Sequence, residues 1–195
     1  MIPLTTKPLR ADARRNREKI LKAARAVFAD QGRDAQIDDV ARRARVGVGT
    51  VYRHFPTKDA LLHALSDELF DVVAAYAEKA LERDDAWEAF KDVLWFAGEK
   101  TSGDRAFSEV MAAQRDTEPR LCPGQIALSE YVSELIQRAQ DSGRMRTDLI
   151  LEDIPLVMCG IGSASGMDHP RPNAWRRHLG IVLDGIRAEA ATRPL

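Results

Sequence analysis

Apolar residues recur every three or four positions along almost the whole chain, which is the spacing of one face of an α-helix. The longest such run goes from Leu61 to Leu81, directly after Pro56, which ends the preceding segment, and Thr57, a good N-cap. No convincing alternating strand and no internal repeat interrupts this pattern. The predicted fold class is therefore all-α, with helices over residues 12–31, 37–44, 50–55, 57–81, 86–101, 105–115, 124–141, 149–165 and 174–190.

The charges are divided unevenly between the two ends of the 195-residue chain. Residues 1–63 hold 14 Lys/Arg and 7 Asp/Glu, whereas the remaining residues hold 15 Lys/Arg and 23 Asp/Glu. This asymmetry indicates a basic module that meets a polyanion, joined to an acidic body that does not. We expect a basic N-terminal domain over residues 1–56, beginning with a flexible basic arm over 1–11, and a helical body over 57–195.

The residues typical of metal, cofactor and catalytic sites do not form a recognised pattern. The two cysteines, Cys122 and Cys159, have no CxxC spacing, and the four histidines form neither HxxxH nor HExxH. The glycine-rich stretch 159–166 resembles a dinucleotide loop, but Pro170 and Pro172 follow at once and forbid the helix that such a loop requires. We therefore expect no metal, no cofactor and no catalytic residue.

Targeting and membrane signals are also missing from the sequence. The first 15 residues lack the apolar core of a signal peptide. No apolar run approaches the roughly 20 residues of a membrane span. The expected location is cytoplasmic, with no membrane partner.

The stretch "VGVGTVYRHF" (46–55) follows a short helix and two closely spaced glycines, which is the pattern of a helix-turn-helix. Helical geometry turns Val51 and Phe55 inward, because they are four residues apart. The outer surface then carries four hydrogen-bonding side chains suited to phosphate and base contacts, namely Thr50, Tyr52, Arg53 and His54. The alternative is a polar helix that is merely solvated.

The segment "IDDVARRARVGVGTVYRHFPTKDALLHAL" (37–65), with the upstream helix "REKILKAARAVFADQG" (17–32), resembles the DNA-binding domain of the tetracycline-repressor-type (TetR) family. The resemblance implies an all-helical homodimer with a three-helix DNA-binding domain, a long fourth helix and a variable ligand-binding body. It also implies phosphate contacts from Thr50, Tyr52, His54 and Lys58, and positions near base edges for Val48, Gly49 and Arg53.

Two residues of the turn depart from the pattern of that family. Arg45 stands where glycine is usual, so it must tolerate the backbone conformation of the turn. Gly47 stands where serine often caps the recognition helix, so that cap would lack its side-chain acceptor. The basic residues near the N-terminus, from Lys7 to Arg17, form either an arm on DNA phosphates or in the minor groove, or a solvated tail.

The body contains aromatic and methionine residues of the kind that line adaptable small-molecule pockets. Ordinary core packing is the alternative for each of them. The candidate ligand-binding residues are Trp87, Phe90, Trp95, Phe96, Phe107, Met111 and Met158.

The last two predicted helices have features of a dimer surface, because small residues permit close approach and an apolar stripe follows. The candidate interface residues are Gly160, Gly162, Trp175, Leu179, Val182 and Ile186. The alternative is that the stripe covers the core of its own protomer.

Together these features predict a DNA-binding transcriptional regulator. The expected partners are a double-stranded palindromic operator, an unknown small-molecule effector and a second copy of the chain, and the expected role is a ligand-responsive repressor without enzymatic activity. The alternative function is a helical small-molecule-binding protein or enzyme with an incidental basic N-terminal module.

Overall fold

The computed structural model describes residues 7–102, 104, 106, 107, 121–166 and 173–195. Within these residues the regular elements are α-helices and short 3-10 helices, with no strand, which confirms the all-α prediction. The contacts divide the chain into two compact units. Unit 1 is Met1–Ser66 with Arg105–Thr117, and unit 2 is Asp67–Asp104 with Glu118–Leu195.

Unit 1 is built from three helices and the beginning of a fourth. These are α1 (Lys7–Gln31), α2 (Ile37–Ala44), α3 (Val48–His54) and the first turns of α4 (Lys58–Ala80), with the 3-10 turn η1 (Gly32–Asp34) after α1. Gly32 has a φ of 57°, the left-handed conformation that ends a helix and favours glycine. Residues 7–11, expected in a flexible arm, lie in the first turns of α1, where Pro8 is tolerated because early helical N–H groups need no partner.

The core of unit 1 joins one face of α1 to the helices that follow. Ile20 and Phe28 of α1 pack in one cluster with Val40 of α2, Val51 of α3 and Leu61 of α4, and all five are almost fully buried. Burying a side chain of this size contributes roughly 1.5–3 kcal/mol relative to leaving it exposed. The short helices α2 and α3, too short to be stable alone, are thus held in place by α1 and α4.

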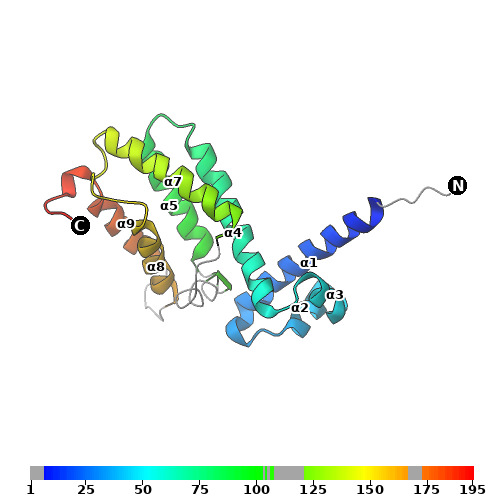
Figure 1. Cartoon of the computed structure of the whole chain (residues 1–195). Coiled ribbons are helices and arrows are strands. Elements are labelled where there is room, and N and C mark those ends of the chain that lie inside the picture. Colours follow the sequence, from blue (N-terminus) through cyan, green and yellow to red (C-terminus); the bar gives the residue numbers. More distant parts are fainter. Residues whose placement is uncertain (1–6, 103, 105, 108–120, 167–172) are drawn as a thin grey trace. The chain divides into compact units, whose positions relative to one another are not determined.

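Unit 2 consists of the rest of α4 with four further helices and a short C-terminal turn. These are α5 (Ala86–Thr101), α7 (Pro123–Asp141), α8 (Asp153–Gly166), α9 (Ala174–Gly185) and η3 (Ala188–Ala190). Helix α5 packs against α7, α8 and α9, and α8 packs against α9 (Figure 1). The side chain of Asp85 caps α5 by accepting the N–H of Glu88 at 3.0 Å.

Tertiary contacts shift two helix ends from their predicted positions. The sequence predicts a helix over 149–165 capped by Asp148, but α8 begins at Asp153. Asp148 instead forms a bidentate pair with the buried Arg146, at 2.6 and 2.9 Å. Helix α9 ends at Gly185 instead of residue 190, because the carbonyl of Ile186 accepts the N–H of Arg146 and the chain then turns away. Of the helix predicted over 105–115, only residues 106 and 107 lie within the described part of the chain.

Candidate nucleic-acid interface

Helix α3 has one buried side and one exposed side. Val51 is 0% exposed and Phe55, directly after the helix, is 4% exposed, which confirms their predicted inward placement. Tyr52 and Arg53 are exposed between them, and Tyr52 keeps 48% of its accessible surface. Thr50 and His54 are half-buried, whereas Val48 and Gly49 at the start of the helix are exposed. The structure therefore collects six of the seven predicted DNA-binding residues on one short helix.

The turn before α3 holds its conformation without side-chain help. Arg45 has a φ of 56° and a ψ of 46°, so a non-glycine residue occupies the left-handed region at this turn. The N–H of Arg45 bonds to the carbonyl of Arg42 at 3.2 Å. Gly47 is the N-cap of α3 and makes no side-chain cap bond, as expected, while its carbonyl accepts the N–H of Thr50 at 2.8 Å.

Gly49, the second residue of α3, lies in open space. A Cβ added there would meet no atom of the chain within 4 Å. Its backbone is helical, so the left-handed region that favours glycine is not used. Packing and backbone strain in the free protein therefore give no reason for glycine at this position, whereas a closely approaching partner backbone would.

Arg53 is folded back along α3 in the free protein. Its Nε donates to the carbonyl of Gly49 at 3.2 Å, one turn earlier. The bond uses Nε, so the two terminal nitrogens keep the fork geometry with which arginine contacts guanine.

Two further cations lie beside aromatic rings of unit 1. The Nζ of Lys58, in the first turn of α4, is 5.4 Å from the centroid of Phe28. The guanidinium of Arg17 on α1 is 5.5 Å from the centroid of Phe55, and so lies next to the C-terminal end of α3. Contacts of this kind contribute about 0.5–1 kcal/mol at exposed sites. They hold Lys58 against α1 and Arg17 against the residue that follows α3.

The predicted ligand-binding residues are spread over several environments. Trp87 and Phe90 are fully buried in the core of unit 2. Trp95 lies 5.9 Å from the ring of Trp175, and Met158 packs half-buried against the same core. Phe96 stacks on Tyr76 of α4, with centroids 4.1 Å apart. Phe107 belongs to unit 1, and Met111 lies outside the described residues.

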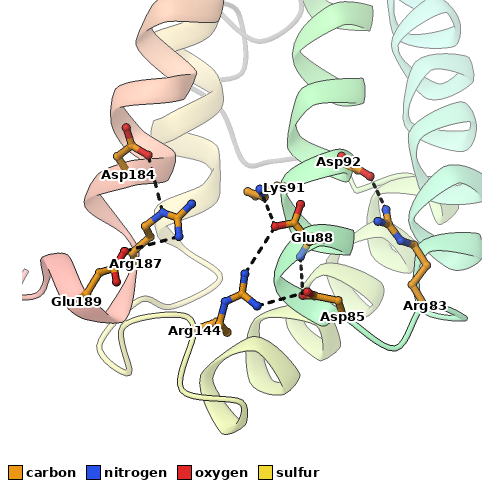
Figure 2. Close-up of polar contacts among 9 residues, drawn as sticks. All are labelled: Arg83, Asp85, Glu88, Lys91, Asp92, Arg144, Asp184, Arg187 and Glu189. Atoms are coloured by element: carbon orange, nitrogen blue, oxygen red, sulfur yellow. Dashed lines mark hydrogen bonds and ion pairs between the residues drawn. The ribbon is translucent and has the colours of Figure 1, made fainter.

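A cleft of about 570 Å³ opens at one end of unit 2, and none of the predicted ligand-binding residues lines it. Arg144 pairs there with Asp85 at 3.3 Å and with Glu88 at 3.6 Å, and Lys91 also contacts Glu88 (Figure 2). The N–H of Glu88, with Arg144, holds the pKa of the Asp85 carboxyl below its usual range. The cleft is lined by three carboxylates, those of Asp84, Asp85 and Asp141, and by two guanidiniums, those of Arg138 and Arg144.

Most of the predicted dimer residues pack inside their own protomer. Trp175, Leu179 and Ile186 are 4%, 0% and 6% exposed, because they pack in the core of their own unit. Gly160 is likewise occupied within the protomer, since a Cβ there would overlap the ring of His178 on α9. Among the predicted residues, Gly162 and the half-buried Val182 remain near the surface.

Other side chains occupy the outer surface of α8 and α9. Leu156 is 71% exposed and Ile181 is 62% exposed. The apolar stripe of α9 thus faces the core of unit 2, and Ile181 lies on the other side of the helix. Spacing alone could not reveal this, because an apolar stripe predicts burial but not whether the covering surface comes from the same protomer.

A helix-turn-helix whose second helix presents polar side chains, followed by a helical unit, defines a DNA-binding transcriptional regulator. Residues 20–65 match the model of bacterial regulatory proteins of the tetR family, and residues 83–188 match the C-terminal domain of SbtR-like transcriptional regulators. The chain belongs to the TetR family of bacterial transcriptional regulators.

Individual relatives agree with this assignment. The chain is 28% identical over 148 residues to the HTH-type transcriptional regulator SrpR of Pseudomonas putida, covering 73% of this chain and 69% of SrpR. A TetR transcription regulatory protein from Mycobacterium vanbaalenii superposes with a TM-score of 0.63 at 29% identity, covering 92% of this chain and 99% of that one.

A second similar structure, RolR in complex with resorcinol, shares the fold. Its TM-score is 0.62 at 21% identity, covering 95% of this chain and 97% of RolR. Over the described residues, no helix of our chain combines the length and apolar character needed to cross a membrane.

Proposed function

We propose that this TetR-family regulator is a ligand-responsive repressor that binds a palindromic operator as a homodimer. The observation that carries the proposal is the two-sided α3, with Val51 fully buried and Tyr52 and Arg53 exposed. In such a unit the second helix enters the major groove. The phosphate contacts in this proposal are Thr50, Tyr52, His54 and Lys58, and the residues at base edges are Val48, Gly49 and Arg53.

Dimerisation follows from the size of the recognition element. One short helix reads too few base pairs for useful specificity, so two copies are needed on a two-fold symmetric site. The DNA-binding domain in this proposal is 1–56, and 57–195 binds the effector and the partner copy. The exposed Leu156 and Ile181 support an interface on α8 and α9, where Gly162 leaves room for close approach.

A small-molecule effector is supported by the shared fold of RolR, which holds resorcinol. Within unit 2, the half-buried Trp95, Phe96 and Met158 are the proposed contacts, whereas Trp87 and Phe90 are fully buried in the core. To lower operator affinity 100-fold, the effector must favour the non-binding state by about 2.7 kcal/mol. Operator DNA must then weaken effector binding by the same factor.

The proposal includes no catalytic step and no cofactor, in keeping with relatives that are transcriptional regulators. Because an operator lies on the bacterial chromosome, the proposal includes a cytoplasmic location. The alternative, a helical small-molecule-binding protein or enzyme with an incidental basic module, predicts no sequence-specific binding of DNA.

Selection from a random-sequence duplex library tests the proposal. The wild-type chain should enrich a palindromic consensus and bind it about 10³-fold or more tightly than random DNA at physiological salt. Arg53→Ala should reduce this preference. Lys79→Ala, which removes an exposed cation from the part of α4 that lies in unit 2, should leave it unchanged. Enrichment of no consensus, or equal binding of random DNA, would refute a specific repressor.

A further inference from the structure

The N-terminal part of α1 extends beyond the core of unit 1. The first buried residue of α1 among those whose side chains are described is Ile20, so residues 11–19 add no buried apolar side chain to unit 1. Figure 1 shows α1 running on past α2 and α3 toward the N-terminus. From Lys7 to Lys19 this extension measures about 20 Å at the rise of an α-helix. Packing within the described chain therefore gives no reason for a helix of this length.

The basic residues of the extension are arranged with helical spacing. Lys7, Arg10, Arg14 and Arg17 are separated by three, four and three residues, so they occupy one face of α1. The same spacing continues into Leu21, Ala24 and Phe28, which are buried in the core of unit 1. The basic stripe therefore continues, beyond the core, the face of α1 against which the helix-turn-helix packs.

Arg17 connects this stripe to the proposed DNA-binding surface. Its guanidinium lies over the ring of Phe55, the residue that follows α3. From this point the stripe leads about 15 Å away along α1 to Lys7. Since phosphates of one strand are spaced by about 3.4 Å along the duplex axis, that length corresponds to roughly four base pairs.

Among the described side chains of the stripe, Arg14 and Arg17, only Arg14 lies within ion-pair distance of a described carboxylate. The Nε of Arg14 is 3.7 Å from Glu18, but the two side chains are 77% and 64% exposed, so this pair is worth little. The first turn of α1 contains no acidic residue, although negative charge is what stabilises that end of a helix. A polyanion along this face would supply the missing negative charge.

We propose that the basic stripe Lys7–Arg10–Arg14–Arg17 is a second DNA contact, which binds backbone phosphates beside the base pairs read by α3. This inference rests on the proposed function, and it adds a rigid helical arm that contributes affinity but no sequence preference. Phosphate contacts act through counterion release, so the arm makes binding more dependent on salt.

The test compares two triple variants of the full-length chain. K7A/R10A/R14A removes three cations from the stripe and retains Arg17, which packs on Phe55. The control R15A/K19A/K22A removes three cations from a face about 120° around α1. None of the control residues is buried, so both variants should fold, and circular dichroism melting verifies this.

Fluorescence anisotropy titrations at several salt concentrations give the result, with the duplex enriched by the wild-type chain and with a random-sequence duplex. The stripe variant should weaken binding to both duplexes by a similar factor. Its salt slope should fall by about 0.9 for each lost phosphate contact, or about 2.7 per protomer. The control should keep its slope within one unit of wild type.

Each other outcome has a definite meaning. A stripe variant with the wild-type slope on both duplexes overturns the arm and leaves the proposed function intact, because α3 would then account for binding alone. Equal losses of DNA affinity and salt slope in the stripe and control variants also overturn the arm, since the lower net positive charge of α1 would then explain both. If the wild-type chain enriches no duplex, the proposed function fails, and the slope on random DNA alone then decides whether the stripe binds phosphates.

Discussion

Replacing Gly49 with alanine should make the protein more stable and at the same time weaken its binding to DNA. The residue is the second of α3, its φ is not in the left-handed region, and a Cβ there would meet nothing within 4 Å. Glycine to alanine at such a compatible helical position stabilises by about 0.4–1 kcal/mol, mainly by restricting the unfolded chain. For a chain of this size, 1 kcal/mol corresponds to about 2–4 °C in Tm.

The binding effect has the opposite sign, because the new methyl group points into the space that the proposed function assigns to DNA. Forcing one extra methyl into a packed contact typically costs about 1–3 kcal/mol, which is about 5- to 150-fold in affinity for each half-site. The assay combines a thermal melt with anisotropy titration against the selected duplex. Gly185→Ala is the matched control, since that helical glycine of α9 also has nothing within 4 Å of its Cβ position.

The two measurements separate the possible explanations. A variant that melts higher and binds as wild type shows that DNA does not approach Gly49 closely, and the close-approach argument is then wrong. A variant that melts lower shows that the backbone at position 49 is not the relaxed helix described here. The control should gain stability without any change in DNA binding.

Four further predictions concern other residues. Arg53→Ala should cost about 1–3 kcal/mol per half-site and relax preference at one base pair; a uniform loss across single-base operator variants would contradict a base contact. Lys58→Ala should weaken binding to all sequences alike and lower the salt slope by about 0.9 per protomer, as titrations at several salt concentrations will reveal. The pair Leu156→Glu and Ile181→Glu, made together at exposed positions, should give a folded monomer in analytical ultracentrifugation, and a persisting dimer would place the interface elsewhere. The Arg146 guanidinium holds the pKa of the Asp148 carboxyl well below its usual range, so the pair stabilises the fold above about pH 4, the pKa in the unfolded chain, and this contribution is lost as pH falls further. Asp148→Asn should therefore lower Tm at pH 7 and make Tm fall less steeply as the pH is lowered. An unchanged curve of Tm against pH would show that the pair does not stabilise the fold.

The helix-turn-helix was predictable because local pattern and tertiary structure agree there. Val51 and Phe55 are the inward pair that four-residue spacing requires, and their burial leaves Tyr52 and Arg53 outside. The left-handed backbone at Arg45 was also predictable from the sequence, since the family usually has glycine at that turn. The DNA contacts themselves remain predictions, because they depend on a partner.

The errors arise where a distant residue competes with the local signal. Asp148 has the chemistry of an N-cap, but the buried Arg146 and the C-terminal tail engage it, so α8 starts at Asp153, four residues later than predicted. The N–H of Leu195 donates to that same carboxylate at 3.0 Å, a contact that no local pattern reveals. Leu179 illustrates a different ambiguity, since an apolar stripe predicts burial but not whether the covering surface comes from the same protomer.

The distribution of the indoles gives this protein a built-in optical probe. Its three tryptophans, at positions 87, 95 and 175, all belong to unit 2, and unit 1 has none. Trp87 and Trp175 are almost fully buried, so their emission should lie at short wavelength in the native state and shift to the red when unit 2 unfolds. Operator DNA bound at α3 cannot quench a tryptophan of unit 1, because unit 1 contains none. Any change of tryptophan emission on adding unlabelled operator must therefore arise in unit 2. The size of that change would report, without an attached dye, how strongly DNA binding alters the unit that is proposed to bind the effector.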